Sequence, residues 1–82
     1  MTNQQVARAF AEGKETGKSL HMFIEGDTVY SYGKHFPIAR RVGEKKVNFT
    51  NEKNSSSTNR QKSLVLQELN KAGIEVIPVD MF

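Results

Sequence analysis

The chain has 82 residues, of which 37% are hydrophobic and none is cysteine, and its formal net charge is +3. A chain of this length forms one domain, over residues 1–82, and its small core gives it a reason to associate with a partner. Without cysteine it has neither a disulfide framework nor a thiolate zinc site. It has no apolar run near the roughly 20 residues of a transmembrane helix, and "MTNQQVARAFAEG" has no apolar signal region. We therefore expect a cytoplasmic protein with no membrane contact.

The basic residues are segregated along the chain. Residues 34–62 hold eight basic and two acidic residues, a net charge of +6, whereas the rest holds four basic and seven acidic residues, a net charge of −3. Such segregation suits a polyanionic partner or an acidic protein surface. The alternative is that this segment forms a solvated face.

The first predicted element is a short helix over residues 3–12. Thr2 or Asn3 caps it, because either side chain can accept a hydrogen bond from a free amide of the first turn. Val6 and Phe10 stand four residues apart and form its apolar stripe. The glycine that opens "GKETGKS" ends the helix, and we predict that this stretch is a loop.

Two hairpins are predicted next. Residues 20–33 ("LHMFIEGDTVYSYG") alternate in polarity on either side of a turn at Gly26-Asp27. Residues 35–42 form a third strand, in which Pro37 belongs at the start, at an edge or at a bulge because it lacks an amide donor. "VGEKKVNF" completes a second hairpin with a turn at Gly43-Glu44.

The strongest predicted helix covers residues 60–73, with Ser57 or Thr58 as its N-cap. Gly73 ends it, and Ile74 packs back on it as in a Schellman motif. Its apolar stripe repeats at helical spacing and consists of Val65, Leu69 and Ala72.

Residues 74–79 ("IEVIPV") form the last strand, where Pro78 marks the strand end or a sheet edge. The predicted order is therefore α-β-β-β-β-α-β. It indicates an α+β domain with a small antiparallel β-sheet of about four to five strands and an N-terminal and a C-terminal helix on one face.

The chain carries a series of short motifs. They are Phe10-x-x-Gly13, "YSYG" at 30–33, "PIA" with two arginines at 37–41, Asn51, and a helix entry with Ser55, Ser57 and Thr58. Over about residues 6–70 the chain resembles a family of small uncharacterised proteins from tailed viruses of bacteria and from archaea. Its members often carry a histidine one turn into the second helix, where this chain has Gln61. The resemblance implies a viral origin and the cytoplasm of a host cell, and it implies no activity.

Tyr30 and Tyr32 are two residues apart in a predicted strand, so their side chains share one face, opposite Val29 and Ser31. If the valine side is the core, both tyrosines face outward, where rings beside basic residues can stack nucleic-acid bases. His35 would extend this surface. The alternative is that the tyrosines pack under a helix, with their hydroxyl groups at its rim.

The start of the second helix is a candidate anion site. A helix N-terminus offers free amides and a partial positive charge, and Ser57 and Thr58 add hydroxyl groups to it. Arg60 and Lys62 add cations that oppose the helix dipole, which favours a visiting anion. The alternative is an ordinary cap followed by a solvated basic turn.

Arg40 and Arg41 are neighbours in a strand, so they point to opposite faces of the sheet. One of them should face solvent together with Lys45 or Lys46. The alternative is that these cations guard an exposed strand edge.

No catalytic constellation is present in the sequence. It has no nucleophile elbow and no phosphate-binding glycine loop. His21 and His35 are its two histidines, and nothing in their spacing favours a zinc site. We therefore expect a protein that is not an enzyme and that has no metal or cofactor.

The sequence favours a non-enzymatic binding protein that contacts a polyanion, namely RNA, single-stranded DNA or a phosphorylated nucleotide. The candidate binding residues are Tyr30, Tyr32, His35, Arg40, Arg41, Lys46, Ser57, Thr58, Arg60 and Lys62. The alternative is a viral inhibitor that binds a host defence or transcription protein. Either function is compatible with a homo-oligomer that pairs through its sheet edges or through "EVIPVDMF".

Overall fold

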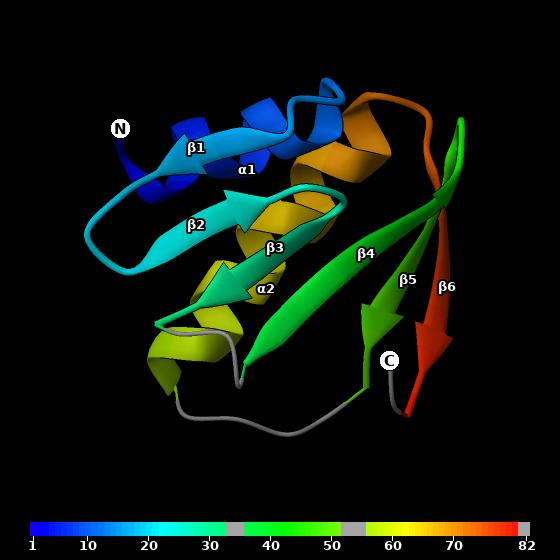
Figure 1. Cartoon of the computed structure of the whole chain (residues 1–82). Helices are drawn as coiled ribbons and strands as arrows, with labels where there is room; N and C mark the ends of the chain where they lie inside the picture. The colour runs from blue at the N-terminus through cyan, green and yellow to red at the C-terminus, as the bar shows by residue number, and fades with distance from the viewer. Residues whose placement is uncertain (33–35, 52–55, 81–82) are drawn as a thin grey trace.

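The computed structural model describes residues 1–32, 36–51 and 56–80. The elements follow in the order α1 (Asn3–Ala11), β1 (Thr16–Lys18), β2 (Met22–Glu25), β3 (Thr28–Ser31), β4 (Pro37–Gly43), β5 (Lys46–Thr50), α2 (Ser56–Lys71) and β6 (Glu75–Val79). The strands form one sheet in the order β1-β2-β3-β4-β5-β6 (Figure 1). Neither described helix is long and apolar enough to cross a membrane.

The predicted α+β class is confirmed, but the sheet differs from the prediction in two ways. It has six strands, because β1 lies in "GKETGKS", which we expected to be a loop. This three-residue strand lacks the apolar alternation that marks a strand in a sequence. In addition, β6 pairs with β5 in parallel, so the sheet is mixed rather than antiparallel. The reason is that α2 carries the chain back, so that β6 runs in the same direction as β5.

The ends of α1 follow the sequence signals. The Thr2 hydroxyl accepts from the Gln5 N–H at 3.1 Å, and Gln5 Oε1 accepts from the Thr2 N–H at 2.8 Å, which completes a capping box. Gly13 follows with a φ of +90°. The Lys14 N–H then donates to the Ala9 carbonyl, so the helix ends in a Schellman motif.

The start of α2 was predicted too late. Both expected N-caps, Ser57 and Thr58, lie inside the helix, which begins at Ser56. The predicted stripe is confirmed at Val65 and Leu69, which are fully buried, but Ala72 is exposed beyond the end of the helix. The predicted Schellman motif is present: Gly73 has a φ of +72°, and the Ile74 N–H donates to the Leu69 carbonyl.

Both predicted hairpins form. Gly26 and Asp27 connect β2 to β3, and Gly26 supplies the positive φ of the turn, +64°. The second turn lies one residue later than predicted, because β4 continues to Gly43, which pairs with Lys46 beyond a bulge. The prolines lie where their missing amides are tolerated, Pro37 at the start of β4 and Pro78 in the edge strand β6.

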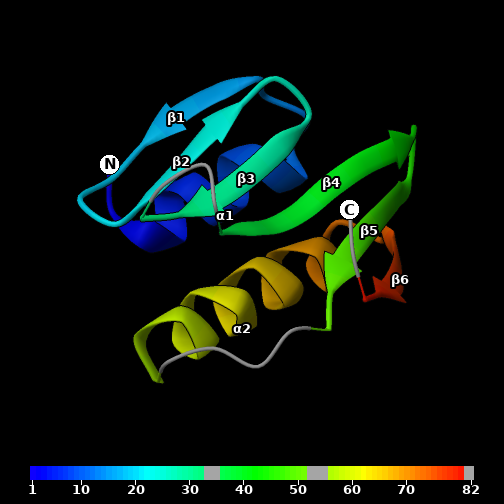
Figure 2. The same ribbon diagram turned by 60° about the horizontal axis from the view of Figure 1, so that its bottom comes forward.

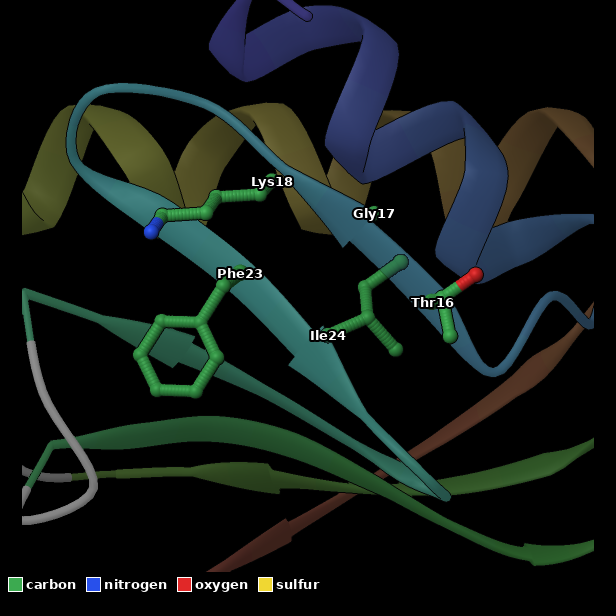
Figure 3. A pocket seen from close by; sticks show the side chains of 5 residues that line it. All are labelled: Thr16, Gly17, Lys18, Phe23 and Ile24. Carbon is green, nitrogen blue, oxygen red and sulfur yellow. The ribbon is translucent and has the colours of Figure 1, made fainter.

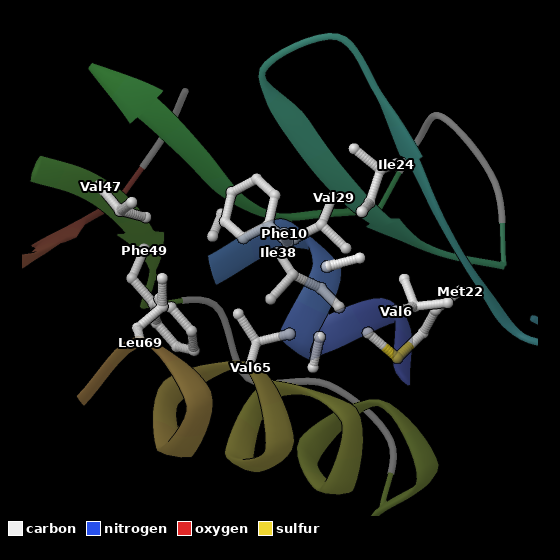
Figure 4. Close-up of a cluster of buried hydrophobic side chains, with 13 residues drawn as sticks. Val6, Phe10, Met22, Ile24, Val29, Ile38, Val47, Phe49, Val65 and Leu69 are labelled. Carbon is white, nitrogen blue, oxygen red and sulfur yellow. The ribbon is translucent and has the colours of Figure 1, made fainter. Parts of the chain in front are cut away.

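Both helices cover the same face of the sheet (Figure 2). Phe10 from α1 and Leu69 from α2 meet inward side chains of the strands, such as Ile38, in one continuous core (Figure 4). The helices are also joined by Glu68, whose side chain is 6% exposed and whose Oε1 lies 3.4 Å from Arg8 Nε. The other face of the sheet has no described helix over it, and it displays the residues that alternate with the core.

We predict that Leu69→Ala lowers the free energy of unfolding by about 2–5 kcal/mol, because it leaves a cavity in the core. The matched variant Leu66→Ala truncates a 37% exposed side chain of the same helix. It should cost less than about 1 kcal/mol. Urea denaturation followed by circular dichroism measures both, and equal losses would contradict the helix face assigned here.

Candidate functional site

The uncovered face of the sheet carries a stacked pair of aromatic rings. Val29 and Ser31 are fully buried, so the valine side is the core and Tyr30 points to the opposite face, which is one of the two alternatives left open by the sequence. Its cross-strand neighbour on β2 is Phe23, and the two ring centroids are 5.0 Å apart with an interplanar angle of 18°. Tyr30 therefore does not pack under a helix but forms part of a surface.

A second ring pair follows along the same hairpin. The ring centroids of His21 and Tyr32 are 5.0 Å apart, with an interplanar angle of 47°, and the Tyr32 N–H donates to the His21 carbonyl at 2.8 Å. His21 directly precedes β2 and Tyr32 directly follows β3, so the two pairs are neighbours along the hairpin. We call His21, Phe23, Tyr30 and Tyr32 the aromatic strip.

Tyr32 has an unusual backbone conformation. Its φ of +64° lies in the left-handed region, and no other non-glycine residue in the described ranges has a positive φ. This conformation costs roughly 1–2 kcal/mol for an L-residue, and such residues cluster at functional sites. Here it takes the chain out of β3 and leaves Tyr32 53% exposed beside His21. Tyr32 is exposed because of this turn and not because of strand alternation.

One end of the aromatic strip borders a cavity of about 280 Å³. It is lined by Asn3, His21, Tyr32, Arg60, Gln61 and Leu64. Arg60 is exposed and forms no ion pair with any described residue. Gln61 is only 2% exposed and accepts a hydrogen bond from the Ser31 hydroxyl, which fixes one polar wall. The cavity therefore combines a fixed amide, two aromatic rings and an available cation.

The other end of the strip borders a hollow of about 410 Å³ over β1 and β2. It is lined by Thr16, Gly17, Lys18, Phe23 and Ile24 (Figure 3). Lys18 is the cross-strand neighbour of Phe23 on β1, so the Phe23 side chain stands between Lys18 and Tyr30. Lys18 is exposed and has no ion-pair partner among the described residues. A cation is thus available at each end of the strip.

The two predicted arginines point to opposite faces, and both have partners within the protein. Arg40 Nε lies 3.3 Å from Asp27 Oδ2 on the uncovered face. The Arg41 guanidinium lies 4.4 Å from the Phe10 ring centroid, and it donates to the carbonyls of Phe10, Lys14 and Gly26. Burial lowers the pKa of Arg41, which stays charged because guanidinium does not deprotonate in proteins. Arg41 therefore fastens β4 to the end of α1, and its role in binding stays a prediction.

The other predicted residues are dispersed. Thr58 is 6% exposed with its hydroxyl 3.4 Å from that of Ser31, so it faces the core and is not placed to hold an anion. The Lys62 ammonium lies 6.0 Å from the Phe49 ring centroid, and Lys46 is exposed on β5. The side chain of Ser57 and the whole of His35 lie outside the described residues.

Sequence reasoning missed Lys18, His21 and Phe23 as members of this surface. The signal for Phe23 was present, because it alternates with Met22 and Ile24 and the turn at Gly26-Asp27 sets it opposite Tyr30. Lys18 could not be placed, since its strand was expected to be a loop.

No protein-family model, curated protein or solved structure matches the chain. Across residues 1–32, 36–51 and 56–80, no group of three or more His, Cys, Asp or Glu side chains is arranged to hold a metal ion.

We predict that Arg41→Gln lowers the free energy of unfolding by about 1.5–3 kcal/mol, because it removes charge-assisted bonds to backbone carbonyls. Arg40→Gln removes the same charge from the next residue but breaks an exposed pair, which should cost less than about 1 kcal/mol. Thermal and urea unfolding measure both. Equal losses would remove the structural role assigned to Arg41.

The pKa of Asp27 lies below its ordinary value, because the Thr28 hydroxyl and, next, Arg40 stabilise the carboxylate. A carboxyl group with a lowered pKa stabilises the fold at a pH above its unfolded pKa of about 3.9. This stabilisation is lost as the pH falls through the pKa of the folded state. Asp27→Asn should therefore be less stable than the wild type at pH 7 by at most about 1 kcal/mol. The difference should shrink as the pH falls below about 4 and should vanish once the pH lies below the folded pKa. Unfolding at both pH values measures it, and a difference that persists in acid would contradict this origin.

Proposed function

We propose that this protein is a non-enzymatic binding protein for single-stranded nucleic acid, which it holds along the aromatic strip. One observation carries the proposal. Two ring pairs follow each other along the hairpin, Phe23–Tyr30 on the uncovered face and His21–Tyr32 beside the start of α2, and each end has an exposed cation with no ion pair among the described residues. Rings supply stacking surfaces for bases, and cations supply contacts to phosphates.

The aromatic strip suits a ligand that binds by stacking its bases on the rings. Aromatic stacking contributes roughly 1–3 kcal/mol per base and tolerates any sequence, because every base has a flat face. Phe23 borders an apolar hollow, where a base can pack against the ring beside the Lys18 side chain. Tyr32 borders the cavity that holds Arg60, where a phosphate can meet the guanidinium.

The basic segment, residues 34–62, supports only a modest electrostatic contribution to the binding affinity. Of its arginines, Arg40 is paired with Asp27 and Arg41 is bound to backbone carbonyls. If Lys18, Arg60 and one further cation contact phosphates, the logarithm of affinity should fall with the logarithm of salt at a slope of about −2. The resemblance to proteins of tailed viruses supports host-cell nucleic acid in the cytoplasm as the setting.

The experiment is fluorescence anisotropy with labelled single-stranded RNA and DNA oligonucleotides, over a range of salt. We expect Tyr30→Leu, which keeps the apolar bulk and removes the ring, to weaken binding by about 5- to 100-fold. Arg60→Gln should weaken binding and lower the salt slope by about 0.7. Lys45→Gln is the matched control, since it removes the same charge from the β4–β5 turn.

Equal effects of Arg60→Gln and Lys45→Gln would contradict a defined site and indicate charge attraction alone. Absence of binding to either nucleic acid at low salt would reject the proposal. It would leave the alternative from the sequence, an inhibitor of a host defence or transcription protein. Binding of a mononucleotide as tight as that of an oligonucleotide would restrict the site to the Arg60 cavity.

A further inference from the structure

The two edges of the sheet differ in what they offer to another strand. On β6, the Glu75 N–H donates to the Lys45 carbonyl, and the Val79 carbonyl accepts from the Asn51 N–H. In a parallel pair this places the backbone groups of alternate residues toward β5, so those of Val76 and Pro78 point outward. Pro78 has no amide to donate, and proline on an edge strand protects it from pairing.

The β1 edge, whose strand reads Thr16-Gly17-Lys18, has no proline. The Glu15 carbonyl accepts from the Gly26 N–H, and the Ser19 N–H donates to the Met22 carbonyl. The backbone N–H and carbonyl groups of residues 15, 17 and 19 therefore point toward β2. Those of Thr16 and Lys18 point outward, away from the sheet. Both residues are exposed, and each carries an outward N–H and an outward carbonyl.

We propose that two copies of this chain pair through β1, antiparallel, about a two-fold axis at Gly17. This inference does not rest on the proposed function. In this register Thr16 of each copy lies opposite Lys18 of the other, so every outward N–H meets a carbonyl. Glu15 then faces Ser19 and Lys14 faces Leu20, so no like charges stand directly opposite.

Exposed apolar side chains near β1 also favour pairing of two copies at this edge. Leu20, 89% exposed, and Met1, 58% exposed, are the two most exposed large hydrophobic residues in the described ranges. Leu20 follows β1 directly, and the Met1 sulfur lies 3.4 Å from the position that a Cβ on Gly17 would take. A second copy at this edge brings both side chains to the interface.

The difference between the edges also sets the size of the assembly. An interface of one patch with itself closes at two copies, whereas pairing through both edges would build a filament. Because Pro78 protects β6, we expect a dimer. Its two sheets join edge to edge, so the two aromatic strips lie on one continuous face.

Sedimentation velocity without nucleic acid tests the proposal over roughly 10 µM to 1 mM, since interfaces of small area are weak. We expect a concentration-dependent dimer. Lys18→Pro removes an outward amide without breaking a bond to β2, so it should weaken dimerisation about tenfold or more, whereas Lys18→Ala should change it less than about threefold. A monomer at every concentration, or a Lys18→Pro dimer as tight as the wild type, would overturn the proposal.

Cross-linking gives a second test, because the chain has no cysteine. Residues opposite each other in a pair without mutual hydrogen bonds have Cα atoms about 4.5 Å apart, within the range of a disulfide. A Cβ on Gly17 would lie 3.2 Å from Ile24 Cδ1, the far end of a side chain that can adjust. Oxidised Gly17→Cys should form a covalent dimer in dilute solution. The control Ala72→Cys, exposed after α2, should not, and equal cross-linking of both would contradict the register.

Discussion

Two helices cover one face of a six-stranded sheet, and this one-sided cover determines what the other residues can do. In each strand that packs against the helices, successive side chains point alternately into the core and to the uncovered face. The core therefore takes Ile24 and Val29, and the uncovered face takes Phe23 and Tyr30. The candidate site follows from this division, because a second helical layer would have buried the rings that we assign to binding.

Charge in the sequence and charge available at the surface are different quantities in this protein. The net charge of residues 34–62 led us to expect a polyanionic partner. The arginines of this segment differ, however, in whether they have partners within the protein. Arg41 is bound to backbone carbonyls and to the Phe10 ring, whereas Arg60 has no ion-pair partner among the described residues. Lys18, outside the segment, also remains available. The binding proposal therefore rests on the arrangement of rings and cations more than on net charge.

Local signals predicted most of the fold. Capping residues, glycines at helix ends and alternation around Gly26-Asp27 act over a few residues, and each placed its element within a few positions. Two local features without a recognisable sequence signal were missed. β1 forms a strand because β2 lies beside it, and the left-handed φ of Tyr32 has no marker in the sequence. Gln61 stands where the resembling family often has histidine, and its buried bond with Ser31 gives this polar position a structural role.

The central claim is that the ligand lies along the aromatic strip, and amide chemical-shift mapping tests it most directly. A ¹⁵N-labelled sample titrated with a short single-stranded RNA should show its largest shifts at His21, Phe23, Tyr30, Tyr32 and Arg60. The exposed faces of α1 and the β6 edge should change little. Shifts centred on α1 or on β6, or no shifts at low salt, would contradict the assignment of the aromatic strip as the binding surface.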